Sequence, residues 1–118
     1  METRQHNHSH TDTCFDCAEA CERCLTACLE MGDADSKGHD MTDCIKLCRD
    51  CADICTLCAR LQARGSRFMA QFMQLCADVC EACATECEKH ADHMAHCKAC
   101  AEACRRCAQE CRHMANAS

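Results

Sequence analysis

The sequence predicts an all-α protein, an antiparallel up-down-up-down four-helix bundle with a cysteine-lined core. Two observations carry this prediction. The nineteen cysteines among 118 residues fall into four groups, and neighbouring cysteines within a group are three or four positions apart. Steps of three and four give a mean period of about 3.5, the period of a helix face that packs against other helices. The groups are separated by short loop signals, and short loops favour antiparallel neighbours.

Each cysteine group defines one expected helix. Ala and charged residues between the cysteines are good helix formers or suit an outward face. On the last helix the charged positions between residues 98 and 112 are interpreted as a solvated face. The four groups are, in chain order, Cys14, Cys17, Cys21, Cys24 and Cys28; Cys44, Cys48, Cys51, Cys55 and Cys58; Cys76, Cys80, Cys83 and Cys87; and Cys97, Cys100, Cys104, Cys107 and Cys111.

The expected helix boundaries follow from glycines and capping residues. The stretch 32–38 has glycine at both ends and is interpreted as a loop, with Asp40 as the next N-cap. Gly65 and Ser66 predict a helix end followed by a new cap. The third turn has no glycine, so Asp92 is its expected cap, with one continuous helix as the alternative. The expected helices are about 12–31, 40–63, 66–90 and 93–114, in a bundle over 12–114 flanked by a flexible His-containing tail, 1–11, and a C-terminal tail, 115–118.

The composition leaves cysteine, alanine and methionine to fill the core. Only twelve residues are Ile, Leu, Val or Phe, a low share for a globular domain. The net charge of −6 comes from interleaved signs, which favours neither nucleic acid nor a membrane surface as a partner. The polar start and the lack of a long apolar stretch predict no signal peptide and no membrane span. We therefore expect a cytoplasmic protein, and nineteen thiols in a reducing compartment indicate metal binding.

The cysteine pattern favours Cu(I) as the metal. Cysteines three or four apart on a helix have Cβ atoms roughly 5–6 Å apart, so a pair can chelate one ion. Zinc held by four thiolates leaves two negative charges uncompensated, and several such sites in one core are costly. A monovalent ion at about one per thiolate brings the core near neutrality, and soft thiolate ligands favour Cu(I). All nineteen cysteines are therefore candidate ligands for multiple Cu(I) ions.

The histidines and methionines are interpreted by their position in the expected bundle. His90, His93 and His96 lie at one end and are expected to bind or admit copper. Met31, Met41 and Met94 at the same end fit two roles, passing copper inward or closing the bundle. The opposite end is interpreted as an apolar plug. The early histidines are interpreted as part of a solvated tail, with metal capture as the alternative. The plug residues are Leu61, Phe68, Met69, Phe72, Met73 and Met114, and the tail histidines are His6, His8 and His10.

Two other functions stay open on the sequence alone. One is a structural bundle that holds a few zinc ions, for which nineteen cysteines allow at most four all-cysteine sites. The other is a thiol redox protein, which would depend on one or two cysteines of low pKa. Storage of copper, without catalysis and without catalytic residues, is the favoured function.

The cysteine motifs resemble those of the bacterial copper storage proteins, in particular the cytosolic class. The resemblance runs from about Cys14 to Met114 and rests on CFDCAEACERCLTAC, CADICTLC, CADVCEACATECEKH and CKACAEACRRCAQEC. It implies a four-helix bundle with a Cu(I)–thiolate core and a homotetramer. It also implies that the histidines of KHADHMAHC lie at the open end of the bundle. The resemblance does not indicate which protein would donate copper to the chain or accept copper from it.

Overall fold

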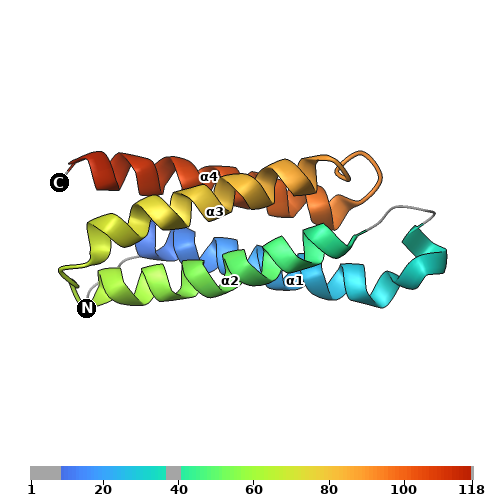
Figure 1. Ribbon diagram of the computed structural model, residues 1–118, viewed down its shortest axis with the longest axis horizontal. Helices are drawn as coiled ribbons and strands as arrows, with labels where there is room; N and C mark the ends of the chain where they lie inside the picture. The colour runs from blue at the N-terminus through green and yellow to red at the C-terminus, as the bar shows by residue number, and fades with distance from the viewer. Residues whose placement is uncertain (1–8, 37–40, 118) are drawn as a thin grey trace, which may run out of the picture.

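Over the residues that the structure describes, the chain folds into four helices packed side by side around a common axis (Figure 1). The computed structural model describes residues 9–36 and 41–117. The helices are α1 (His10–Ser36), α2 (Thr42–Ala63), α3 (Met69–Glu88) and α4 (Ala95–Ala117), and no strand occurs in the described ranges. Contacts join α1 to α2, α2 to α3, α3 to α4 and α4 to α1. The predicted up-down-up-down bundle is therefore confirmed.

Helix α1 extends beyond the range expected from the sequence at both ends. It runs through Gly32 to Ser36, into the stretch interpreted as a loop. At its start, Ser9 Oγ accepts a hydrogen bond from the Asp12 N–H at 3.1 Å, and Asp12 Oδ2 accepts one from the Ser9 N–H at 3.3 Å. This reciprocal pair is a capping box, which satisfies backbone donors that the first helical turn leaves free. It starts the helix inside the expected tail. Asp40, the expected N-cap of the second helix, lies outside the described residues.

The other two turns differ from expectation in their caps. Gly65 has a φ of +61°, the left-handed conformation that its position predicted. Ser66 Oγ accepts a hydrogen bond from the Phe68 N–H at 3.1 Å, so Ser66 stabilises the turn and α3 begins three residues later. Residues 89–94 form the last turn, so the alternative of one continuous helix is wrong. Met94, and not Asp92, is the residue that precedes α4.

The core consists of thiols and small apolar groups. Every cysteine is free and buried, and Cys28, at 4 % exposed, is the most accessible of them. Alanines such as Ala59 and Ala77 fill the space beside the cysteines, and Met73 is the largest fully buried side chain. Since a thiol packs as a small apolar group, this interior can form without the usual Leu and Ile. In the part of the chain that is described, no helix is long and apolar enough to cross a bilayer.

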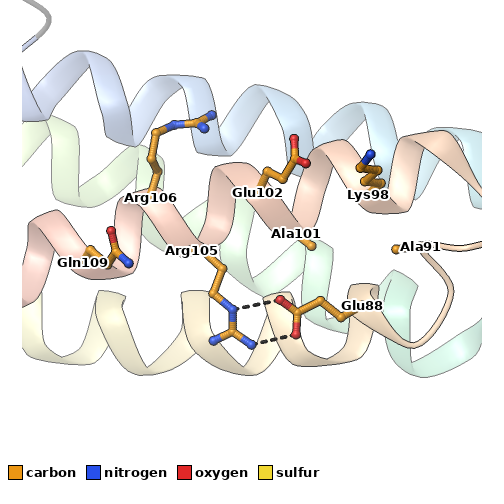
Figure 2. A pocket seen from close by; sticks show the side chains of 8 residues that line it. All are labelled: Glu88, Ala91, Lys98, Ala101, Glu102, Arg105, Arg106 and Gln109. Carbon is orange, nitrogen blue, oxygen red and sulfur yellow. Dashed lines mark hydrogen bonds and ion pairs between the residues drawn. The ribbon is translucent and has the colours of Figure 1, made fainter.

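The outward face of α4 is the solvated charged surface that the sequence predicts, but two arginines join it to α3. Arg105 donates from Nε and Nη2 to the Glu88 carboxylate at 3.0 and 2.8 Å (Figure 2). Arg112 donates to Glu81 at 2.9 and 2.8 Å and to Asp78 at 2.9 Å. Exposed ion pairs contribute little to stability, and these two link the surfaces of α4 and α3. A shallow pocket surrounds the first pair, and its α4 side is formed by Lys98, Ala101, Glu102, Arg106 and Gln109.

Candidate metal centre

The cysteine side chains form a continuous column of sulfur atoms along the bundle axis. Adjacent Sγ atoms in this column are 3.5 to 4.0 Å apart, and all four helices contribute to it. One path through the column runs Cys14, Cys107, Cys55, Cys51, Cys104, Cys100, Cys48, Cys87 and Cys44. The expected contacts within one helix occur, as between Cys51 and Cys55 at 3.9 Å, but most contacts cross between helices.

The spacing of the sulfur atoms suits metal ions. A disulfide needs an S–S distance of about 2.05 Å, whereas even Cys55 and Cys80 have Sγ atoms 3.5 Å apart. Three thiolates around a trigonal ion, with metal–sulfur bonds of about 2.3 Å, lie about 4.0 Å from one another. The metal-free sulfur positions are already close to that arrangement, so binding requires little movement.

Groups of four sulfur atoms overlap along the column. Within each group, all ligand atoms lie within 4.8 Å of one another. Cys17, Cys21 and Cys104 each belong to two groups. Because these sulfur atoms are shared, neighbouring sites require thiolates that bridge two ions. Three of the groups are Cys17, Cys55, Cys80 and Cys107; Cys17, Cys21, Cys51 and Cys104; and Cys21, Cys83, Cys100 and Cys104.

Many of the buried thiols hold their protons in the metal-free bundle. Hydrogen bonds with the thiols of Cys100 and Cys104 raise the pKa of Cys21, and burial adds to the rise because it disfavours the thiolate. The pKa of Cys76 is raised in the same way by Cys107 and Cys111. Thiolate is the ligating form, so metal ions must displace these protons, and binding strengthens as the pH rises.

The three histidines predicted as ligands occupy different environments. His96 Nε2 lies 3.5 Å from the Cys28 Sγ, in a group with Cys24 and Cys97 whose ligand atoms are within 4.8 Å of one another. His90 is buried at the same end, and its Nε2 lies 3.2 Å from the Glu86 carboxylate. His93 is exposed on the turn before α4. The structure thus brings only His96 of the three into a group with sulfur atoms, and ligation by all three histidines stays a prediction.

His10 is a candidate ligand for which the sequence analysis favoured a solvated tail over metal capture. Its Nε2 lies 3.4 Å from the Cys111 Sγ and 3.7 Å from the Cys14 Sγ. Burial lowers the pKa of His10, but hydrogen bonds with Cys14, Cys58 and Glu110 outweigh this and raise the pKa to about 10. Two signals could have revealed it: His10 lies four residues before Cys14 on the same helix face, and the Ser-x-x-Asp pattern of 9–12 marks a helix start. His6 and His8 lie outside the described residues.

The end of the bundle next to His10 is less apolar than predicted. Met73 is buried, and Met69 and Phe72 pack against the core as a plug would. Phe68 and Met114, however, are 57 % and 39 % exposed. The plug interpretation is therefore wrong for these two residues, and polar side chains, Gln62 and His10 among them, reach the sulfur atoms at this end.

The comparisons with known proteins agree with this geometry. The sequence model of the copper storage protein family matches residues 3–116. The chain belongs to the copper storage protein family. A comparison with curated proteins found no match.

Solved copper storage proteins share the fold. The Cu(I)-bound copper storage protein BsCsp3 is 47% identical over 90% of this chain and 94% of that chain, with a TM-score of 0.82. Metal-free copper storage protein 3 from Bacillus subtilis is 45% identical, with coverages of 92% and 97% and a TM-score of 0.79. A cytosolic copper storage protein from Streptomyces lividans, in a structure with five coppers, is 38% identical, with coverages of 91% and 89% and a TM-score of 0.82.

In this member of the copper storage protein family, all nineteen cysteines predicted as ligands reach the core. The helix period was enough to place them there. The identity of the sulfur atoms that meet across the axis was not predictable, because it depends on the relative register of the four helices.

Proposed function

We propose that this member of the copper storage protein family stores and buffers Cu(I) in the cytoplasm and has no enzymatic role. Its cysteine thiolates hold many Cu(I) ions along the bundle axis. Two observations on relatives support the proposal: BsCsp3 is described as Cu(I)-bound, and the cytosolic Streptomyces lividans protein has been seen loaded with 10 copper equivalents. The proposed ligands are the nineteen cysteines with His90, His93 and His96.

The observation that carries the proposal is the sharing of sulfur atoms between groups. Cys17, Cys21 and Cys104 each take part in two four-sulfur groups, so separate four-thiolate sites cannot fill both groups at once. A structural zinc protein needs such separate sites, each with two excess negative charges. Monovalent ions bridged by shared thiolates keep the charge of a buried core near zero, which limits the cost of burying it.

The thiol redox alternative has less support in the structure. A redox thiol needs access to its partner and a low pKa. All nineteen cysteines are buried and none exceeds 4 % exposure. Cys58 has a pKa lowered to about 6, chiefly by a hydrogen bond with Cys111, but it is fully buried. The burial that makes these thiols poor redox groups suits them to hold a cargo of ions away from water.

The His96 end of the bundle is proposed to admit copper. Met41 and Met94 are buried there, at 6 % and 7 % exposed, and their thioethers are soft ligands that suit Cu(I). His96 lies at the same end, beside the Cys28 Sγ. An incoming ion would therefore pass from thioether and imidazole to thiolate. This arrangement fits the first of the two roles open to these methionines, although their burial also helps to close the bundle.

An anaerobic titration tests the storage function. Reduced protein is titrated with Cu(I) in the presence of a chromophoric Cu(I) chelator. We expect the chelator to stay uncoloured until more than about ten equivalents have been added, because roughly one ion per thiolate neutralises the core. Colour after two to four equivalents would contradict storage and favour the structural zinc bundle.

A homotetramer is the proposed assembly. The support from the structure is a set of large apolar side chains on the outside of single helices, among them Phe15 on α1 and Leu75 on α3, 46 % and 50 % exposed. Exposed apolar side chains supply a subunit contact where they join into one patch. Sedimentation equilibrium should give four times the chain mass of 13.1 kDa. A monomer mass at micromolar concentration would contradict it.

A further inference from the structure

We propose that His10 is a Cu(I) ligand and completes a metal site at the end of the bundle opposite His96. The site consists of His10 with Cys14, Cys58 and Cys111, drawn from α1, α2 and α4. Both termini of the described chain lie at this end in Figure 1. The inference rests on the proposed storage function and adds a nitrogen ligand at an end where the sequence predicted an apolar plug.

The first support is the position of the imidazole ring. His10 Nε2 lies 3.4 Å from the Cys111 Sγ and 3.7 Å from the Cys14 Sγ. With the Cys58 Sγ, these four ligand atoms lie within 4.8 Å of one another. The His10 side chain is only 6 % exposed, although it belongs to the first residue of a helix. Imidazole and thiolate both suit copper ions.

The second support is the partner of the other ring nitrogen. His10 Nδ1 lies 3.1 Å from the Glu110 Oε1. Metal-ligating histidines almost always use the second nitrogen to hold a carboxylate, carbonyl or water, which fixes the ring orientation. Glu110 does this here and turns Nε2 toward the sulfur atoms. A simple surface ion pair would need only the Nδ1 contact and would leave the rest of the ring in solvent.

Gln62 provides the third support. Its Nε2 donates to the Cys14 Sγ at 3.6 Å and to the Cys58 Sγ at 3.7 Å. The Thr11 hydroxyl donates to the Gln62 Oε1 at 3.5 Å and orients the amide. Donors aimed at sulfur favour the thiolate, which is the ligating form. When Cu(I) binds, it takes the place of the protons shared among the sulfur atoms and Nε2, and these protons leave to solvent.

The consequence is a column of thiolates with an imidazole at each end. His96 stands beside Cys28 at one end, and His10 beside Cys111 at the other. A neutral imidazole in place of a fourth thiolate lowers the negative charge of a terminal site. The ions at both ends are therefore held with less excess charge than an all-thiolate site would have, close to the surface where exchange begins.

Nitrogen-15 NMR of the imidazole rings tests this inference directly. Cu(I) has a filled d shell and is diamagnetic, so histidine-labelled protein can be followed through an anaerobic titration, with His10→Gln used for assignment. We expect the His10 Nε2 resonance to move on loading to a position that differs from those of both an N–H nitrogen and an unprotonated, metal-free ring nitrogen. His113, exposed near the same end of α4, is the matched control and should stay unchanged.

The outcomes separate this inference from the storage function. If the His10 Nε2 resonance does not move in protein that takes up more than about ten ions, His10 is not a ligand, and the storage function stands. If the His10 Nε2 resonance moves in protein that binds only a few Cu(I) ions, the result supports the site and contradicts storage.

A second experiment tests whether Glu110 holds the His10 ring in position for copper. Loss of an outer-shell partner typically weakens metal binding about 10- to 100-fold. In Glu110→Gln, a small fraction of the bound copper should therefore pass to a chelator about 10-fold faster or more, while the rest is unaffected. Glu102→Gln, exposed on the same helix, should release copper like the unaltered protein. Unchanged release from both Glu110→Gln and His10→Gln, with helicity retained, would overturn the proposal.

Discussion

Replacing Cys17, Cys21 and Cys104 together with alanine is expected to cost the protein more copper than removing three cysteines at the bundle ends. Each of the three thiols belongs to two overlapping sulfur groups. A thiolate that bridges two ions weakens two positions when it is lost, so the loss should exceed the roughly three ions that one ion per thiolate would give. The measurement is the number of Cu(I) equivalents bound before a chromophoric chelator is coloured.

The matched control is the triple alanine variant at Cys28, Cys58 and Cys111. These thiols lie at the ends of the column, where His96, Gln62 and His10 are among their neighbours. Alanine already occupies much of the core, and each lost sulfur leaves a cavity that costs on the order of 1 kcal/mol. Far-UV circular dichroism of the metal-free variants shows whether both still fold. Equal copper losses from two folded variants would mean that sulfur atoms are not shared.

This comparison also separates storage from the thiol redox function. A redox protein would lose its function when one or two particular cysteines are replaced. A store loses capacity in steps, whichever cysteine is removed. Single alanine variants at Cys51 in the middle and Cys58 at the end should therefore both retain most of their copper.

The cysteine period was sufficient to predict the fold because it acts on one helix at a time. Steps of three and four place a side chain on the same face, so Cys44 to Cys58 had to lie on one stripe of α2. Short loops then fixed the antiparallel order. The relative register of the four helices could not be predicted from the cysteine period. It depends on how side chains of the four helices pack across the axis, where contacts such as that of Cys17 with Cys104 join residues far apart in sequence.

His10 shows why part of the candidate site was missed. Histidines at 6, 8 and 10 alternate with polar residues, a pattern typical of a solvated tail. A local capping box draws His10 into the helix, and Glu110, one hundred residues away, turns its ring toward sulfur. The helix start at His10 could have been predicted from Ser9 and Asp12. The orientation of the His10 ring depends on the packing of α4 against α1.

Raising the pH well above the ordinary thiol pKa of about 8.5 is expected to unfold the metal-free bundle but not the copper-loaded one. Twelve of the nineteen cysteines have a raised pKa in the folded chain, seven a lowered one, and neighbouring thiols are the leading cause. The thiols of lowered pKa are ionised in both states above the ordinary thiol pKa and add no pH dependence there. In that range the thiols of raised pKa keep protons in the folded chain that the unfolded chain gives up. The free energy of unfolding therefore falls as the pH rises.

The size of this effect is large relative to the stability of a small domain. A group with a raised pKa stabilises the fold below its unfolded pKa, and the contribution is lost as the pH rises toward its folded pKa. Above the ordinary thiol pKa, each proton that the folded chain retains costs about 1.4 kcal/mol per pH unit, so about four retained protons would remove about 5 kcal/mol per unit. Domains of this size have only about 5–15 kcal/mol in total. His10, with its raised pKa, acts in the same direction.

Copper removes the cause of this sensitivity, because the loaded core holds metal ions in place of protons. A ligand that binds only the folded chain adds about 4 kcal/mol when its free concentration is a thousand times its dissociation constant. Anaerobic denaturant unfolding between about pH 7 and pH 10.5, followed by circular dichroism, compares the two forms across the thiol pKa. Replacing Cys21 and Cys104 with alanine removes two thiols of raised pKa and should flatten the curve of the metal-free protein. A metal-free bundle equally stable across this range would show that its thiols ionise as easily when folded as when unfolded.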